Sequence, residues 1–272
     1  MTNTESILED YDIIDAHTHI YPMKISMKAS QNIGRFYRLP PRHNGSVDEL
    51  VTNGKACGVK GFLVCSVATT PEQVQSINDF IAEECALHPE FYGFGTLHPM
   101  MEDIGCEIDR IINLGLRGIK LHPDFQRFNV DAPEAYSIYD MVEDRLPILF
   151  HIGDDRYDYS HPRRLSKILG DFKHLRAIAA HLGGFKVWDE VKEYLIKPNV
   201  WFDTSSTLAL LGKEAAKEHM RMLGIDRCFF GTDYPLWDYQ REVQNFLTLG
   251  LKDDENRRIL SGNIKAFLQI CQ

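Results

Sequence analysis

Short apolar runs alternate with longer segments of helical period along almost the whole chain. Eight runs rich in β-branched and aromatic residues are candidate strands, at residues 11–16, 60–66, 91–97, 118–121, 147–151, 176–181, 199–203 and 227–231. Candidate helices lie between or after them, at residues 47–57, 71–88, 103–114, 133–142, 162–169, 186–196, 208–223, 239–249 and 253–272. This alternation predicts an α/β fold of parallel strands joined by crossover helices.

The number of these units selects the architecture. A doubly wound open sheet alternates in the same way, but eight units in 272 residues favour a closed (β/α)8 TIM barrel, which typically needs about 250 residues. We therefore predict a single domain over residues 1–272. Residues 21–46 break the rhythm and predict a long loop after the first strand, either a lid over the catalytic end or a surface insertion.

Composition and charge limit the partners. The 30 basic and 39 acidic residues give a formal charge of -9, and no basic strip is present, which argues against nucleic acid. A small anionic substrate stays compatible with this charge. No basic leader precedes an apolar stretch, and no apolar run reaches the roughly 20 residues of a membrane span, so we expect neither a targeting signal nor a membrane partner.

The six cysteines are scattered and form no Cys-X-X-Cys pair. They are Cys57, Cys65, Cys85, Cys106, Cys228 and Cys271. Several lie in apolar runs, where a thiol packs as a small hydrophobic group. This pattern predicts reduced thiols and a cytoplasmic protein.

Histidines follow or end several predicted strands. His17 and His19 close the first strand, and residues two apart on a strand share a face, so both imidazoles can point at one position. His151 and His181 end two further apolar strands, and Asp233 comes directly after the last one. Such a set suits a catalytic zinc or similar divalent ion with room for water. The alternatives are buried core histidines and an aspartate that caps a turn.

Lys120 and His122 share parity on the fourth predicted strand, so both side chains should face the same side. They are candidates for binding a substrate carboxylate or carbonyl oxygen. The alternative for Lys120 is a structural ion pair.

Six segments together resemble the amidohydrolase superfamily and, within it, the amidohydrolase-2 branch that includes aminocarboxymuconate semialdehyde decarboxylase. They are Asp-Ala-His-Thr-His at 15–19, Gly-Ile-Lys-Leu-His-Pro at 118–123, His151, Ala-His-Leu-Gly-Gly at 180–184, Asn-Val-Trp-Phe-Asp-Thr-Ser at 199–205, and Phe-Gly-Thr-Asp-Tyr-Pro at 230–235. The resemblance covers nearly the whole chain, and it identifies a branch and not a substrate.

The resemblance implies one metal ion held by His17, His19, His151 and Asp233. His181 would then act as an acid, base or electrostatic stabiliser, whereas in binuclear relatives its counterpart binds a second metal and a lysine at the position of Lys120 is carboxylated. Zn²⁺ is the first choice, and Mn²⁺, Fe²⁺ or Co²⁺ would accept the same ligands. Many members of the branch form dimers, so a homodimer is compatible.

The implied activity is hydrolysis of a small carboxylate-bearing amide, lactone or ester through metal-activated water, with Asp233 and His181 as the catalytic residues. The first alternative is non-oxidative decarboxylation or hydration on the same scaffold, because a fold does not decide the reaction. A non-enzymatic metal-binding barrel is the remote alternative, and a nuclease is disfavoured by the acidic charge.

Overall fold

The structure is a computed structural model that describes residues 11–197 and 199–270, so Cys271 and the two ends of the chain lie outside it. All eight predicted strands are present and follow one another in one sheet in the order of the sequence, as a (β/α)8 barrel requires. They are β1 (Ile13–His19), β2 (Val59–Cys65), β3 (Phe91–Thr96), β4 (Gly118–Leu121), β5 (Ile148–Phe150), β6 (Ala177–Ala179), β7 (Val200–Asp203) and β8 (Cys228–Phe229).

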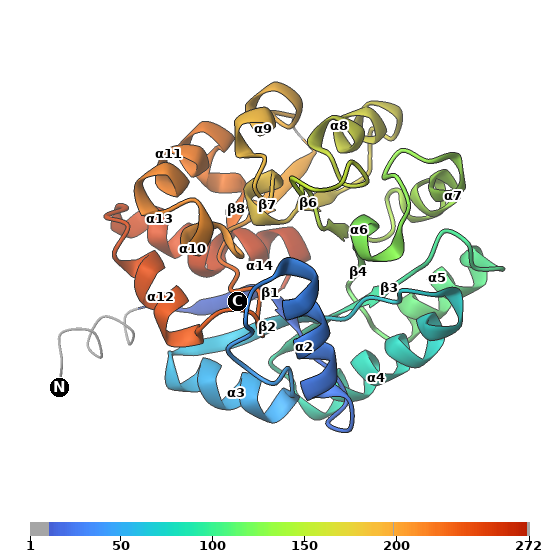
Figure 1. Ribbon diagram of the computed structural model, residues 1–272, viewed down its shortest axis with the longest axis horizontal. Coiled ribbons are helices and arrows are strands. Elements are labelled where there is room, and N and C mark those ends of the chain that lie inside the picture. Colours follow the sequence, from blue (N-terminus) through green and yellow to red (C-terminus); the bar gives the residue numbers. More distant parts are fainter. Residues whose placement is uncertain (1–10, 198, 271–272) are drawn as a thin grey trace. The chain divides into compact units, whose positions relative to one another are not determined.

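Helices separate the strands at the predicted places (Figure 1). They are α2 (Ser26–Tyr37), α3 (Val47–Ala56), η1 (Pro71–Gln73), α4 (Val74–Leu87), α5 (Ile104–Asn113), α6 (Pro123–Gln126), α7 (Pro133–Val142), α8 (Pro162–Asp171), η2 (His181–Gly183), α9 (Trp188–Tyr194), α10 (Thr207–Leu210), α11 (Lys213–Leu223), η3 (Ile225–Arg227), α12 (Tyr239–Leu247), α13 (Asp253–Arg257), η4 (Arg258–Gly262) and α14 (Asn263–Leu268). The predicted strand and helix alternation is confirmed.

Two compact units share these elements. Among the described residues, one unit comprises 11–64 and 204–270, and the other comprises 65–203. We call them the terminal unit and the central unit. The prediction of a single domain over residues 1–272 stays a prediction.

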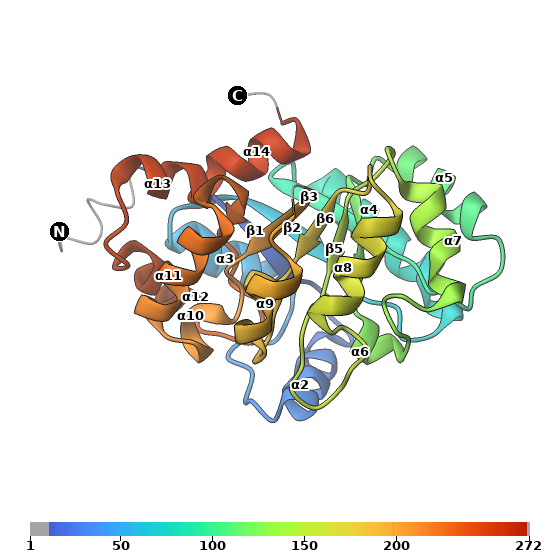
Figure 2. The same ribbon diagram turned by 90° about the horizontal axis from the view of Figure 1, so that it is seen from above.

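The central unit is built on parallel strands with a regular register. Ile119 pairs with Ile148, and Ile148 pairs with Ala177, so the apolar positions of neighbouring strands are aligned. Helix α4 packs along β3, and α5 packs against α7 (Figure 2). On α5 the buried residues recur at three- and four-residue spacing, which is the pattern of a helix with one face in the core: Ile104, Glu107, Ile108 and Ile111.

The terminal unit contains β1, most of β2, β8 and the helices that follow β7 and β8. Helices α11 and α12 both contact α10 (Figure 1). Side-chain caps define two helix starts, since Ser46 accepts a hydrogen bond from the Glu49 amide and Asp238 accepts one from the Arg241 amide. These caps fix where α3 and α12 begin.

The predicted loop at 21–46 is wrong in one respect, because it contains the twelve-residue helix α2. Its buried residues form one narrow stripe of mostly small or polar side chains: Ser26, Ser30, Ile33, Gly34 and Tyr37. Only two of these side chains, Ile33 and Tyr37, are large, so the segment resembles a loop in composition although its buried positions recur at helical spacing. Whether the segment acts as a lid stays a prediction.

Two predicted helices are interrupted. The segment 208–223 breaks at Gly212, which has φ of +87°, a conformation that glycine adopts without a steric penalty. The segment 253–272 contains a five-residue π-helix, η4, between α13 and α14, and its end lies beyond the described residues. A short helix, α6, was not predicted.

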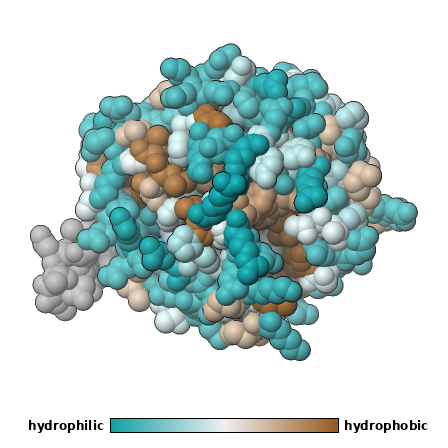
Figure 3. Space-filling model, in the orientation of Figure 1, coloured by the Kyte–Doolittle hydropathy of each residue, from teal (hydrophilic) through white to brown (hydrophobic). Residues whose placement is uncertain are grey.

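Within the described residues, no helix is long and apolar enough to cross a membrane. Five cysteines in this part of the chain form no disulfide: Cys57, Cys65, Cys85, Cys106 and Cys228. The reduced state of the cysteines stays a prediction. The face drawn in Figure 3 is covered mainly by hydrophilic residues, with smaller apolar areas between them.

Glu242 on α12 is buried, and its Oε2 atom has no hydrogen-bond partner. Burial raises the pKa of its carboxyl from 4.5 to about 7, and a hydrogen bond from Asn245 offsets only part of this increase. The fold therefore favours the neutral acid. The stability that the neutral Glu242 carboxyl contributes is fully present below the unfolded pKa of 4.5. It is lost as the pH rises through about 7.

We expect Glu242→Gln to stabilise the protein relative to wild type at pH 8 by about 3 kcal/mol, at about 1.4 kcal/mol for each pKa unit. The difference should shrink toward pH 5. Urea unfolding midpoints at both pH values measure it, with Glu218→Gln on the exposed side of α11 as the control. An advantage of Glu242→Gln that does not depend on pH would contradict the assignment.

Gly153, in the loop after β5, has φ of +87° and lies close to the backbone of the neighbouring loop. A Cβ atom there would be 2.5 Å from the Phe185 nitrogen and 2.7 Å from the Gly184 carbonyl carbon. Gly153→Ala should therefore lower the free energy of unfolding by about 2 kcal/mol or more.

Thermal unfolding measures this effect. Gly170→Ala on α8 is the matched control, because a Cβ there meets no atom within 4 Å and alanine favours a helix. Equal melting temperatures for the two variants would show that the contact at Gly153 relaxes freely.

Candidate metal centre and active site

His17, His19 and Asp233 form a buried cluster in the terminal unit. The Nε2 atoms of the two histidines are 3.1 Å apart, and Oδ1 of Asp233 is 3.7 Å from the first and 3.6 Å from the second. The three residues are 0%, 9% and 5% exposed. The convergence of the two imidazoles is the arrangement that their spacing on β1 predicts.

Backbone hydrogen bonds hold Asp233 beside β1. The Asp233 amide donates to the His17 carbonyl at 3.0 Å, and the His19 amide donates to the Tyr234 carbonyl at 2.8 Å. Asp233 has φ of +63°, which is uncommon for a residue other than glycine. The loop after β8 thus continues alongside β1, and this pairing turns the carboxylate toward the histidines.

Asp15 lies in the core next to this cluster and accepts four hydrogen bonds. Its donors are the His17 amide, the Thr232 amide, the Thr232 hydroxyl and the Tyr239 hydroxyl. Burial raises the pKa of Asp15 to about 6, although these hydrogen bonds lower it in part. Asp15 therefore joins β1, the loop after β8 and α12.

Two serines of the terminal unit contact the cluster, and a tryptophan contacts one of these serines. Ser205 Oγ is 3.0 Å from His17 Nδ1, Ser206 Oγ donates to Asp233 Oδ2 at 2.5 Å, and Trp237 Nε1 donates to Ser206 Oγ at 2.8 Å. Metal-binding histidines and carboxylates commonly have such partners, which fix their orientation.

The donor set of the cluster fits a divalent transition metal ion. Neighbouring ligands of a tetrahedral zinc ion, bound at about 2.0–2.1 Å, are about 3.3 Å apart. The two imidazole nitrogens are 3.1 Å apart and the Asp233 oxygen lies 3.7 Å and 3.6 Å from them, which is close to this spacing.

A second cluster of histidines lies in the central unit, at the ends of β4, β5 and β6. His151 Nδ1 is 2.9 Å from His181 Nε2, and the His122 ring stacks on the His151 ring with centroids 3.9 Å apart. All three side chains are buried. The structure thus brings together three of the histidines that the sequence singled out.

Hydrogen bonds fix the proton positions on two of these rings. His151 Nε2 is 2.9 Å from the Gly153 carbonyl, which can only accept, so in the neutral ring Nε2 carries the hydrogen and Nδ1 carries the lone pair. The Phe125 amide donates to His122 Nδ1, so the neutral His122 ring carries its hydrogen on Nε2. His122 Nε2 is therefore a hydrogen-bond donor in the neutral ring.

His181 is held through its backbone. Its amide donates to Asp203 Oδ1 at 3.2 Å, and its carbonyl accepts from Trp188 Nε1 at 2.8 Å. Its φ of +60° is in the left-handed region, where backbone strain of about 1–3 kcal/mol is common at functional sites. The hydrogen bond to Asp203 thus helps to hold the backbone of His181 in place.

His122, Asp124 and His151 also lie close enough to be considered as metal ligands. Their geometry argues against this, because lone pairs of imidazole lie in the ring plane and the two rings are nearly parallel, at 8°. Asp124 instead accepts from the Ser160 hydroxyl at 2.5 Å, and burial raises its pKa to about 7. The contacts of Asp124 with Ser160 and His151 join the segments that follow β4 and β5.

Lys120 on β4 is completely buried, and its carbonyl accepts a hydrogen bond from the Thr96 hydroxyl. The roles predicted for Lys120 and His122 in substrate binding stay predictions. The sequence did not single out Asp124, Ser206 or the Gly153 carbonyl for this site. Ser206 directly follows a segment that carried the family resemblance, which was the one available signal.

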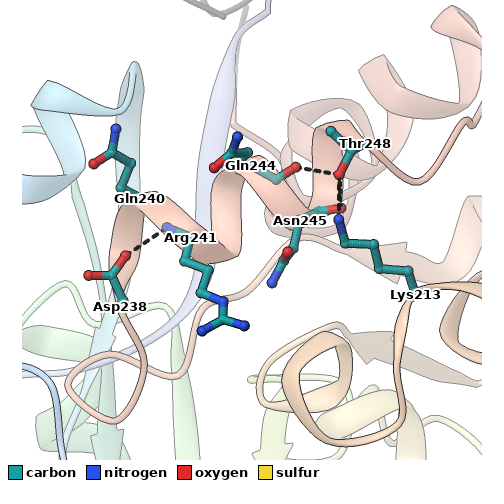
Figure 4. A pocket seen from close by; sticks show the side chains of 7 residues that line it. All are labelled: Lys213, Asp238, Gln240, Arg241, Gln244, Asn245 and Thr248. Carbon is teal, nitrogen blue, oxygen red and sulfur yellow. Dashed lines mark hydrogen bonds between the residues drawn. The ribbon is translucent and has the colours of Figure 1, made fainter.

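A polar groove of about 590 Å³ lies elsewhere on the terminal unit, between α12 and the start of α11 (Figure 4). Its lining residues are Lys213, Asp238, Gln240, Arg241, Gln244, Asn245 and Thr248. None of the site residues predicted from the sequence lines this groove. Lys213 in the groove donates to the Thr248 hydroxyl at 2.8 Å.

Solved structures resemble this chain over nearly its full length. An uncharacterised TIM-barrel protein from Bordetella bronchiseptica is 22% identical, with a TM-score of 0.79 over 95% of this chain and 98% of that one. A 5-carboxyvanillate decarboxylase from Sphingomonas paucimobilis is 16% identical, with a TM-score of 0.76 over 96% and 99%. A probable 2-pyrone-4,6-dicarboxylic acid hydrolase from Acinetobacter baumannii is 15% identical, with a TM-score of 0.71 over 95% and 100%.

These likenesses confirm the predicted TIM-barrel fold. Other matching structures are also decarboxylases, and two of them contain bound manganese. No curated protein matches the chain significantly.

The amidohydrolase family model matches residues 14–270, a span that contains both histidine clusters and Asp233. This match confirms the predicted family and the predicted class of enzyme. The chain belongs to the amidohydrolase family.

Proposed function

We propose that this amidohydrolase binds one divalent metal ion through His17, His19, His151 and Asp233 and acts on a small carboxylate-bearing substrate. The observation that carries the proposal is the buried convergence of two imidazole nitrogens and one carboxylate oxygen in the terminal unit. Zn²⁺ is the first choice for nitrogen and oxygen ligands, and the manganese in two matching structures supports Mn²⁺ as an alternative.

The inclusion of His151 rests on chemistry and on the family resemblance. Its hydrogen bond to the Gly153 carbonyl leaves Nδ1 with a lone pair, which is the form of imidazole that binds a metal. In TIM-barrel enzymes, the residues at the carboxyl ends of the strands form the active site. His151 follows β5 directly, as His17 and His19 end β1.

When bound, a divalent ion supplies Lewis-acid polarisation of a carbonyl or carboxylate oxygen. In hydrolysis, Asp233 takes the proton of the attacking water. His181 donates a proton to the leaving group or stabilises the developing oxyanion. Lys120 and His122 hold the substrate carboxylate or carbonyl oxygen, and the Nε2 hydrogen of His122 is suited to this task.

Hydrolysis of an amide, lactone or ester is the first candidate reaction, and a hydrolase among the matching structures supports it. Non-oxidative decarboxylation is the second candidate, and several matching decarboxylases of aromatic acids support it at least as well. The same residues serve both, because each reaction needs a held carboxylate and a proton donor or acceptor beside it.

Metal content tests the ligand set. We expect about one divalent ion per chain in the wild type and strongly reduced content in His151→Ala, because the variant loses one of four ligands. Elemental analysis of both proteins after reconstitution gives the answer, with His174→Ala as the control because its side chain is 71% exposed.

Two ions per chain would instead indicate a binuclear site with His181 as a ligand and a carboxylated Lys120. Full metal content in His151→Ala would remove this residue from the ligand set. Absence of metal from the reconstituted wild type would overturn the proposal.

Product analysis separates the two reactions. Release of carbon dioxide from an aromatic or unsaturated acid indicates decarboxylation, and opening of a lactone or amide indicates hydrolysis. For either reaction, Asp233→Asn should lower kcat by about 100-fold or more, because the amide cannot take a proton. Unchanged kcat in a metal-loaded Asp233→Asn protein would remove Asp233 from catalysis.

A further inference from the structure

We propose that Ser206 and Trp237 are positioning residues that turn one oxygen of Asp233 toward the metal ion. This inference rests on the proposed function, because it assigns a task to residues that support the same site. Both residues belong to the terminal unit, with Ser206 in the loop after β7 and Trp237 in the loop after β8.

Trp237, Ser206 and Asp233 are joined by a chain of two hydrogen bonds, and the chemistry of the three groups fixes the direction of both. An indole N–H can only donate, so Ser206 Oγ accepts from Trp237 Nε1 at 2.8 Å. The serine hydroxyl has a single hydrogen, and it is donated to Asp233 Oδ2. An ionised carboxylate only accepts, so no alternative direction of this chain satisfies all three groups.

The result is an asymmetric carboxylate. Oδ2 is engaged by Ser206, while Oδ1 is the oxygen that lies 3.7 Å and 3.6 Å from the Nε2 atoms of His17 and His19. Ser206 is completely buried and Asp233 is 5% exposed, so water competes little for these hydrogen bonds. Partners of this kind commonly change metal affinity 10- to 100-fold when they are removed.

The backbone of Ser206 is held in an unusual conformation for this purpose. Its φ and ψ are 57° and -14°, in the left-handed region that a serine rarely adopts. The Ser206 carbonyl accepts from the Leu210 amide at 3.3 Å, which ties the residue to the start of α10. A conformation of this cost persists where the surrounding structure fixes it, and here it directs the hydroxyl at Asp233.

The indole of Trp237 has a separate task, which is to set the direction of the serine hydroxyl. Without the indole N–H, the Ser206 hydroxyl loses the donor that fixes its rotation, so its hydrogen bond to Asp233 Oδ2 is held less strictly. Trp237 is half-buried, so its loss removes less from the core than the loss of a fully buried aromatic residue would. Substitution of Ser206 and substitution of Trp237 should therefore both weaken metal affinity, but to different degrees.

The test measures affinity for Zn²⁺ and Co²⁺ alone, together with the visible absorption spectrum of the Co²⁺ protein. Ser206→Gly removes the hydroxyl and relieves the positive φ, so backbone strain does not add to its effect. Trp237→Phe removes the N–H and keeps an aromatic ring. Ser137→Gly within α7 is the control, because it lowers stability without touching the metal ligands.

We expect Ser206→Gly to weaken metal affinity 10- to 100-fold and to shift the Co²⁺ spectrum. Trp237→Phe should act in the same direction with a smaller effect, and the double variant should equal Ser206→Gly, because Trp237 acts only through Ser206. Ser137→Gly should bind metal as the wild type does.

Wild-type affinity and an unchanged Co²⁺ spectrum in both single variants would overturn the inference and leave the proposed function intact. If the effects of the two substitutions on metal affinity add in the double variant, Trp237 does not act through Ser206. Ser206 would then be the single positioning residue. A wild type that binds neither ion would defeat the proposed function itself, which is a different outcome from either of these.

Discussion

The candidate site depends on one constraint, the burial of Asp15 on β1. A carboxyl group taken out of water needs several hydrogen bonds, and Asp15 obtains them from the His17 amide, from Thr232 and from Tyr239. These donors belong to β1, to the loop after β8 and to α12, so satisfying one buried group holds three elements together. Asp233 follows Thr232 directly, and its position beside His17 and His19 is a consequence of this arrangement.

Groups that can only donate or only accept a hydrogen bond fix the proton positions of neighbouring groups that can do both. The indole of Trp237 can only donate, and the carbonyl of Gly153 can only accept. The first fixes the hydroxyl of Ser206, and the second fixes the tautomer of His151. The backbone amide of Phe125 does the same for His122. Ser206, His151 and His122 therefore each have a fixed hydrogen-bonding state, and such preorganisation lowers the free energy needed to organise a binding site.

The backbone around these residues is strained. Ser206, Asp233 and His181 all have positive φ values, which are costly for residues other than glycine. Each lies next to a hydrogen bond that the site needs, from the Ser206 hydroxyl, the Asp233 amide and the His181 amide. The packed core around them supplies the stability that keeps these conformations.

The sequence alone determined the fold class and the family. Strand periodicity is local, so all eight strands and the shared face of His17 and His19 could be predicted from it, and the residue types at the strand ends indicated a metal. The prediction missed α2, because only two of its buried side chains, Ile33 and Tyr37, are large. Only the tertiary structure decided the hydrogen-bond partners of the candidate site residues. The Asp15 donors, the contact of Ser206 with Asp233 and the carbonyl of Gly153 beside His151 depend on distances between loops and on backbone dihedral angles, which no periodicity records.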